Sequence, residues 1–307
     1  MAAFTIDAAG LGKDFGTRTA VRDLTLKVGR GEAFGFLGPN GAGKSTSIKM
    51  LLGLVKPTRG QALLLGEPVG SRDVRARIGF LPEHFRFYDW LSAAELLMLH
   101  GRLCGVSDGA LGKRVPRLLE RVGLGAQNSK PLRSYSKGMM QRAGLAQALI
   151  NEPDILFLDE PTSGLDPSGR KLVREIVREQ RDRGATVFLN SHLLGEVEQS
   201  CDRVAFIREG QVVGEYQMGG WQKERTSAEI EAAGVSPASV ALLELIAGVR
   251  VDSHVGRRLK VQVEHEDRLA EIVRLLVENG ACIYSVIPQR VTLEDQFLEM
   301  MGPDQGL

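Results

Sequence analysis

A glycine-rich stretch between an apolar run and a helical pattern constrains this chain most. Residues 38–46 read GPNGAGKST and fit the pattern G-x-x-x-x-G-K-[S/T]. The run before it, residues 32–37, predicts a buried strand, and the apolar spacing of residues 47–54 predicts a helix. A strand, a glycine-rich turn and a helix N-terminus in this order form a phosphate cradle, because backbone N–H groups and the positive end of the helix dipole point into the turn.

The residue types inside the loop indicate what it can hold. The glycines let the backbone approach a phosphate without a Cβ in the way. Lys44 would reach the outer phosphates, and the Ser45 hydroxyl would bind Mg²⁺. A chance glycine-rich turn is the alternative, and the lysine, the hydroxyl and both flanking elements argue against it. The candidate binding residues of the loop are Gly38, Pro39, Asn40, Gly41, Ala42, Gly43, Lys44, Ser45 and Thr46.

The composition is that of an ordinary soluble globular protein. The 307 residues predict about two domains, and the net charge of +1 gives no electrostatic reason to expect a nucleic-acid partner. The sequence lacks an apolar run near the roughly 18–20 residues that span a bilayer, and its first residues predict no secretory signal. The three separated cysteines indicate reduced thiols in the cytosol, not a disulfide framework.

The rest of the chain predicts an α/β fold with a helical insertion. Residues 4–28 predict short antiparallel strands, and residues 61–65, 78–82 and 185–190 predict further strands. From about 84 to 150 the pattern is helical: a capping box at Ser92 opens one helix that runs through Leu103, and residues 113–122 predict a second. Residues 203–216 predict a hairpin that turns at Glu209 and Gly210.

Polar side chains follow the predicted strands at their carboxyl ends, where α/β sheets place ligand groups. Asp159 and Glu160 end the strand predicted at 154–160; Asp159 could bind Mg²⁺, and Glu160 could polarise an attacking water. His192 could reach a γ-phosphate, although a lone histidine is more often structural. Phe15 could stack on an adenine ring, although most lone aromatics belong to a core. A solvated pair of strand-end acids is the alternative for Asp159 and Glu160, and the upstream loop favours the functional interpretation.

The pattern changes near residues 218–220, so we divide the chain into a domain of residues 1–218 and an α+β unit of residues 219–307. The second unit predicts helices at 236–247 and 267–279 and strands at 249–253, 257–264 and 281–287. A short helix predicted at 292–301 ends it.

Residues 134–142, SYSKGMMQR, resemble the signature motif of the ATP-binding cassette (ABC) ATPases. Lys137 stands at the first glycine of the usual L-S-G-G-Q pattern, and Met139 stands at its glutamine. Ser136 and Gly138 at a helix N-terminus form an anion site, although Ser136 alone is also a plain helix cap. Residues 1–217 resemble one complete cassette, whose parts in order are Phe15, the Walker A loop 38–46, the signature 135–139, the Walker B strand 155–159 with Glu160, the D-loop 163–166 with Asp166, and the switch His192.

The resemblance implies a Mg²⁺-dependent ATPase that powers a transporter through separately encoded membrane permease subunits. In this family two cassettes pair head to tail, so Ser136 and Gly138 would act on the nucleotide of a second cassette, which could be an identical copy. The chain would lie at the cytoplasmic face of the membrane. ATP and Mg²⁺ are the implied cofactors, Asp166 of the D-loop joins the expected nucleotide site, and Glu160, His192 and Lys44 carry the implied hydrolysis.

Two positions depart from the family pattern. Glu83 stands where the family usually has a glutamine that contacts Mg²⁺ and the attacking water. A carboxylate can serve there, so Glu83 stays a catalytic and metal candidate, but it adds negative charge beside a triphosphate. Met139 cannot donate the hydrogen bond of the usual glutamine.

Residues 86–90, with three aromatics, would dock the membrane subunit or belong to the core.

The last segment favours an exporter. Residues 291–298, VTLEDQFL, are similar to the closing segment of the ATPase subunits of drug- and polysaccharide-type exporters. The similarity implies a regulatory or dimer-stabilising unit. A soluble ABC protein that acts on ribosomes or DNA is disfavoured by the single Walker A loop and the neutral charge. A non-transporting ABC ATPase that drives a membrane protein mechanically stays open. The sequence identifies no transported substrate.

Overall fold

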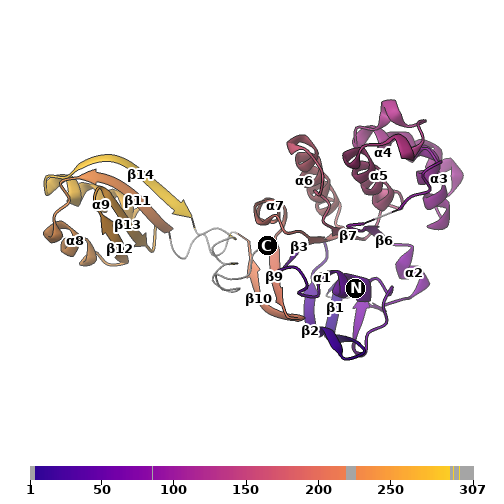
Figure 1. Ribbon diagram of the computed structural model, residues 1–307, viewed down its shortest axis with the longest axis horizontal. Helices are drawn as coiled ribbons and strands as arrows, with labels where there is room; N and C mark the ends of the chain where they lie inside the picture. The colour runs from indigo at the N-terminus through magenta and orange to yellow at the C-terminus, as the bar shows by residue number, and fades with distance from the viewer. Residues whose placement is uncertain (1–3, 85, 219–225, 291–292, 294–296, 298–307) are drawn as a thin grey trace. The chain divides into compact units, whose positions relative to one another are not determined.

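The computed structural model describes residues 4–84, 86–218 and 226–290, together with Leu293 and Phe297. The chain divides into two compact units, one reaching Glu215 and the next beginning at Tyr216 (Figure 1).

A ten-stranded mixed sheet forms the frame of the first unit. The strand order is β5-β4-β1-β2-β10-β9-β3-β8-β7-β6, and β6, β7, β8, β3 and β9 are parallel neighbours in it. Parallel strands are covered on both faces, which explains why β3, β7 and β8 are buried at every position. The strands are β1 Ile6–Phe15, β2 Arg18–Val28, β3 Ala33–Leu37, β4 Arg59–Leu64, β5 Glu67–Pro68, β6 Ile78–Leu81, β7 Ile155–Asp159, β8 Thr186–Asn190, β9 Arg203–Arg208 and β10 Gln211–Gln217.

Four phenylalanines hold the centre of this sheet. The ring of Phe188 in β8 lies 5.5 Å from Phe34, 5.3 Å from Phe36 and 5.4 Å from Phe157, measured between ring centroids. Helix α1 (Lys44–Leu51) adds Ile48 and other apolar residues to the same buried cluster. The core therefore fixes the start of α1 against the carboxyl ends of β3 and β8.

The antiparallel strands at the start of the chain are longer than the sequence predicts. Strand β1 is continuous from Ile6 to Phe15, although its pairing with β2 shifts register between Ala8 and Leu11 and again before Asp14. Gly10 lies in the left-handed region at φ 61°. Glycine allows that conformation at low cost, so the strand continues through bulges where its pattern looks interrupted.

Three helices form the predicted insertion: α3 (Ala93–Leu103), α4 (Asp108–Arg121) and α5 (Lys137–Leu149) lie together in Figure 1. The capping box is confirmed, because Ser92 Oγ accepts from Glu95 N while the Glu95 side chain accepts from Ser92 N. The predicted start of α4 at residue 113 is wrong. The helix begins at Asp108, because the Ser107 hydroxyl caps it.

The other helices of this unit are α2 (Arg72–Arg75), α6 (Pro167–Asp182) and α7 (Leu194–Ser200). Asp166 caps α6 and Pro167 occupies its first turn. The hairpin at Glu209 and Gly210 is also confirmed, with φ angles of 48° and 77° at its two turn residues. The described helices do not combine the length and the apolarity that crossing a membrane requires.

Over the described residues 226–290, the second unit consists of a four-stranded sheet and two helices. Its strand order is β12-β13-β11-β14, and the elements are β11 Thr226–Ala233, α8 Pro237–Glu244, β12 Val249–Val255, β13 Arg258–Val263, α9 Arg268–Glu278 and β14 Cys282–Arg290. The sequence did not reveal β11, because alternating alanine and glutamate is a weak strand signal; its Ala228, Ile230 and Ala232 nevertheless face the core. The helix predicted at 292–301 lies outside the described residues apart from Leu293 and Phe297.

A glycine in β6 sets how closely α5 approaches the sheet. A Cβ on Gly79 would lie 2.0 Å from the backbone oxygen of Ala148. We expect Gly79→Ala to lower the free energy of unfolding by about 1–3 kcal/mol, because α5 must move away. Gly109→Ala is the control, since a Cβ there meets no described atom within 4 Å. Urea denaturation of both variants measures the difference, and equal stabilities would contradict this packing.

Candidate functional site

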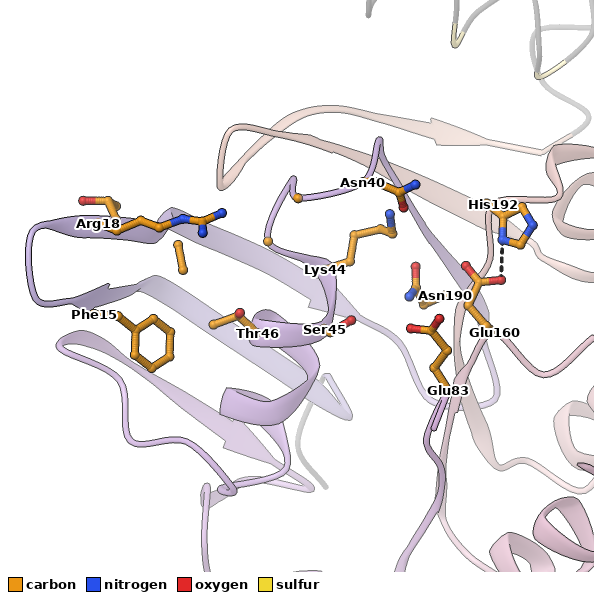
Figure 2. A pocket seen from close by; sticks show the side chains of 14 residues that line it. Phe15, Arg18, Asn40, Lys44, Ser45, Thr46, Glu83, Glu160, Asn190 and His192 are labelled. Atoms are coloured by element: carbon orange, nitrogen blue, oxygen red, sulfur yellow. Dashed lines mark hydrogen bonds and ion pairs between the residues drawn. The ribbon is translucent and has the colours of Figure 1, made fainter. Parts of the chain in front are cut away.

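A pocket of about 710 Å³ opens in the first unit where the glycine-rich loop meets the ends of β6, β7 and β8 (Figure 2). It brings together most of the candidates that lie far apart in the sequence. Its lining residues are Phe15, Arg18, Thr19, Ala20, Asn40, Gly41, Gly43, Lys44, Ser45, Thr46, Glu83, Glu160, Asn190 and His192. The loop residues Gly38, Pro39 and Ala42 shape the turn without lining the pocket.

The glycines of the loop are required by its path. Gly43 precedes α1 at φ 103°, and a Cβ there would lie 2.6 Å from the backbone oxygen of Ala20. A Cβ on Gly38 would lie 2.2 Å from the backbone oxygen of Ile207. The first turn of α1 carries no acidic residue, so the positive end of its dipole stays available for an anion.

Lys44 bridges its own loop. Its ammonium donates to the backbone oxygens of Gly38 at 2.6 Å and Pro39 at 3.1 Å, and the residue is buried. Burial lowers the pKa of Lys44, while the charges of Glu160, Asp159 and Glu83 act in the opposite direction. The buried Lys44 ammonium, together with the backbone amides of the glycine-rich loop, is suited to bind a polyanion.

Glu160 and His192 form a close pair. Glu160 Oε2 lies 2.6 Å from His192 Nδ1, and the glutamate is 7% exposed. Burial raises the pKa of Glu160, and the charge and hydrogen bond of His192 oppose that shift. The backbone of Glu160 is left-handed at φ 52°, which turns the chain sharply after β7. This arrangement aims a basic carboxylate, oriented by a histidine, into the pocket (Figure 2).

Asp159 lies beneath the pocket and is buried. Its carboxylate accepts from the side-chain amide of Asn190 at 2.5 Å. Burial raises the pKa of Asp159, the bond from Asn190 lowers it, and the charge of Glu83 raises it. Ser45, Asp159 and Glu83 offer only oxygen ligands, which suit Mg²⁺. Among the described residues, no group of three or more histidine, cysteine or acidic side chains is arranged to hold a metal ion.

The binding residues predicted in the signature and the D-loop, Ser136, Gly138 and Asp166, do not line this pocket either. Ser136 caps α5, where its hydroxyl accepts from Met139 N at 3.3 Å, and Gly138 lies in the same first turn. Asp166 accepts from Gly169 N at 2.9 Å as the cap of α6, and its hydrogen bond with Ser168 lowers the pKa of its carboxyl. The signature and D-loop candidates are thus helix caps or first-turn residues of α5 and α6.

The structure adds three residues that were not predicted as site residues from the sequence. Arg18 pairs directly with Phe15 across a tight turn, so both side chains reach the pocket from one hairpin. Asn190 ends β8 and contacts Asp159. Gln141 of α5 donates to the backbone oxygen of Glu160 at 3.3 Å. Only Asn190 had a signal in the sequence, since it follows a buried strand as Asp159 does.

The fold and the pocket define a nucleotide-binding domain of the phosphate-loop α/β class. The family described as "ABC transporter" matches residues 21–163. The daunorubicin resistance ATP-binding protein DrrA3 of Streptomyces coeruleorubidus is 38% identical over 313 residues, which cover 99% of this chain and 97% of that protein. The Nod factor export ATP-binding protein I of Rhizobium sp. is 36% identical over 310 residues, 98% of each chain. The chain belongs to the family of ABC transporter ATP-binding proteins.

Other similarities cover part of the chain. The uncharacterized ABC transporter ATP-binding protein all4389 of Nostoc sp. is 47% identical over 196 residues, which cover 63% of this chain and only 58% of that relative's own length. A solved structure described as the ATP binding subunit of an ABC transporter has a TM-score of 0.66 and 31% identity, covering 70% of this chain and 90% of its own.

Proposed function

We propose that this chain binds ATP with Mg²⁺ in the pocket of the first unit, hydrolyses it, and thereby powers an exporter. The observation that carries the proposal is the Glu160–His192 pair, which lies in one pocket with Lys44. Family membership gives an ATP-binding subunit; hydrolysis, the cofactor Mg²⁺, the partners and the direction of transport are inferred from the residues and relatives.

Each side chain has a role that follows from its contacts. The loop amides and Lys44 would bind the triphosphate, and Phe15 would stack on the adenine. Glu160 would accept a proton from the attacking water, while His192 holds its carboxylate in place. Ser45, Asp159 and Glu83 would hold Mg²⁺, which neutralises phosphate charge when bound. Catalysis would come mainly from positioning and charge stabilisation.

A second cassette would complete the site. Ser136 and Gly138 lie at the N-terminus of α5, an anion-binding position that this chain's own pocket does not use. Pairing two cassettes head to tail would bring these residues to the nucleotide of the partner, and Asp166 would lie close to the same junction. We infer a pair of identical chains, with residues 219–307 as a regulatory or dimerisation unit attached to the cassette of residues 1–218.

The membrane subunit would dock beside the helical insertion. A groove of about 330 Å³ lies between the end of β6 and helices α3 and α5, and Phe87 and Tyr88 line it. Tyr88 is 55% exposed and Trp90 is 66% exposed, and these are unusually high exposed fractions for large aromatic side chains. A cytoplasmic helix of a separately encoded permease could bury them, which would place the chain at the cytoplasmic face of the membrane. The relatives named for drug resistance and Nod factor export favour export.

The test of this proposal is recovery of the tagged chain from native membranes. The Glu160→Gln variant with ATP should trap a closed pair and retain a polytopic membrane protein. Adding Tyr88→Ala and Trp90→Ala should reduce that recovery, whereas Tyr284→Ala, which removes an equally exposed ring from the second unit, should not. Recovery of ribosomal or other soluble proteins without a membrane subunit would contradict the exporter.

A separate prediction concerns the stacking of Phe15 on the adenine ring. We expect Phe15→Ala to weaken ATP binding by about 1–3 kcal/mol while binding of inorganic tripolyphosphate changes little, because only the base loses a contact. Phe4→Ala is a matched control, because a lysine ammonium lies over each ring, at 4.9 Å for Phe15 and 5.0 Å for Phe4. Phe4 does not line the pocket. Calorimetric titration measures both, and equal losses for the two ligands would show that Phe15 supports the loop instead of the base.

A further inference from the structure

Asn190 ends β8 directly beside the candidate metal ligand. It pairs in register with Asp159 of the neighbouring parallel strand, so the two side chains lie at the same edge of the sheet. The residue is 1% exposed, and Figure 2 shows its amide among the side chains of Lys44, Glu83 and Glu160. In native proteins, the polar atoms of a fully buried side chain usually each have a hydrogen-bond partner.

One end of Asn190 is firmly bound. The amide nitrogen donates to Asp159 Oδ1, and the backbone oxygen of Asn190 accepts from Glu160 N at 2.9 Å. An ionised carboxylate only accepts hydrogen bonds, so the amide nitrogen must face Asp159 and the amide oxygen must face away from it. A single residue therefore orients the side chain of Asp159 and the backbone of Glu160.

The other end has no partner. Asn190 Oδ1 is buried and accepts no hydrogen bond from any group in the described part of the chain. Buried acceptors without a donor are unfavourable and uncommon in native proteins. Because the residue lines the pocket, a donor that arrives with the nucleotide can reach this oxygen. Mg²⁺ usually keeps several of its waters in protein sites, and those waters can only donate to an acceptor such as this one.

We propose that Asn190 is a positioning residue for Mg²⁺-dependent nucleotide binding. Its amide holds the Asp159 carboxylate in the orientation that binds the ion, and its carbonyl oxygen accepts a hydrogen bond from the ion's hydration shell. This inference rests on the proposed function and assigns a role to a residue that lies outside the motifs named above. If Asn190 only joined β7 to β8, its replacement would lower the stability of the fold. It would then change ATP affinity equally in the presence and in the absence of Mg²⁺.

The test compares ATP affinity of the full chain in Mg²⁺ and in EDTA by calorimetry. In the wild type Mg²⁺ should tighten ATP binding. Asn190→Ala should reduce that tightening by about 10–100-fold, the usual effect of removing a group that orients a metal ligand, while affinity in EDTA stays the same. Asn190→Leu, which keeps the buried volume but has no amide, should show the same loss. On an Asp159→Ala background, Asn190→Ala should have little further effect, because the two residues act together.

Three results would overturn the inference: an unchanged Mg²⁺ effect in both variants, a parallel loss of affinity in Mg²⁺ and EDTA, or a full additional loss on the Asp159→Ala background. Thermal unfolding of each variant separates loss of the fold from loss of the metal effect. If the wild-type chain binds no ATP under either condition, the proposed function fails as well. If the wild type shows tightening that the Asn190 variants keep, only the role of Asn190 fails.

Discussion

Replacing Glu160 with glutamine is expected to slow ATP hydrolysis by about 10²–10⁴-fold, the usual contribution of a general base, while ATP still binds. Glutamine keeps the size of the side chain and an oxygen that can accept from His192 Nδ1, but it cannot take a proton from water. The buried position of Glu160 also raises its pKa, so the carboxylate is a stronger base than an exposed glutamate. Phosphate release and nucleotide titration of the purified chain measure the two effects separately.

Glu152→Gln is the matched control for this variant. Glu152 shares the left-handed backbone of Glu160, at φ 49°, but pairs with Arg114 at 2.8 Å away from the pocket. Its replacement should leave hydrolysis within about twofold, because Glu152 is half exposed and its ion pair lies outside the pocket. Full hydrolysis by Glu160→Gln would show that another group accepts the proton.

Removing the Lys44 ammonium is expected to weaken ATP binding by at least about 10–100-fold, because each hydrogen bond to a charged group contributes about 1.5–3 kcal/mol. The ammonium also donates to the backbone oxygens of Gly38 and Pro39, so it stabilises the loop itself. Lys44→Met retains most of the apolar stem and tests the charge alone. Lys44→Ala removes both the charge and the stem.

Lys49→Ala provides the control, since Lys49 lies on the same helix but is exposed. Its replacement should change ATP affinity by less than about threefold, because solvent and salt screen an exposed charge. Fluorescence titration with a labelled ATP measures all three variants. Unchanged affinity in both Lys44 variants would mean that the loop binds phosphate through its backbone amides only.

Local sequence patterns predicted the parts of the site that depend on short stretches of chain. The helix that follows the glycine-rich loop, the buried strand predicted at 154–160 and the helix opened by the capping box at Ser92 are all confirmed as elements. Each is encoded by neighbouring residues: apolar runs bounded by polar groups, a cap, or glycines at positive φ. The resemblance to ABC ATPases then supplied the roles of Ser136, which spacing alone indicated only as a helix cap.

The site residues and the strand that were not predicted from the sequence depend on contacts between distant segments of the chain. Asn190 contacts Asp159 only because β7 and β8 are adjacent and in register, and Gln141 reaches Glu160 only because α5 lies beside the end of β7. Strand β11 was missed because its alternation uses alanine, whose apolar face becomes evident only once β13 and β14 pair with it. Local periodicity cannot reveal such pairings.

We propose that ATP is hydrolysed at a site shared by two copies of this chain. The most direct test measures phosphate release from an equimolar mixture of Lys44→Ala and Ser136→Arg chains. Each variant alone should be inactive, whereas mixed pairs keep one intact site, so the mixture should recover about a quarter of wild-type activity if the copies associate at random with two-fold symmetry. A mixture as inactive as its components, or full activity of Ser136→Arg alone, would contradict the account.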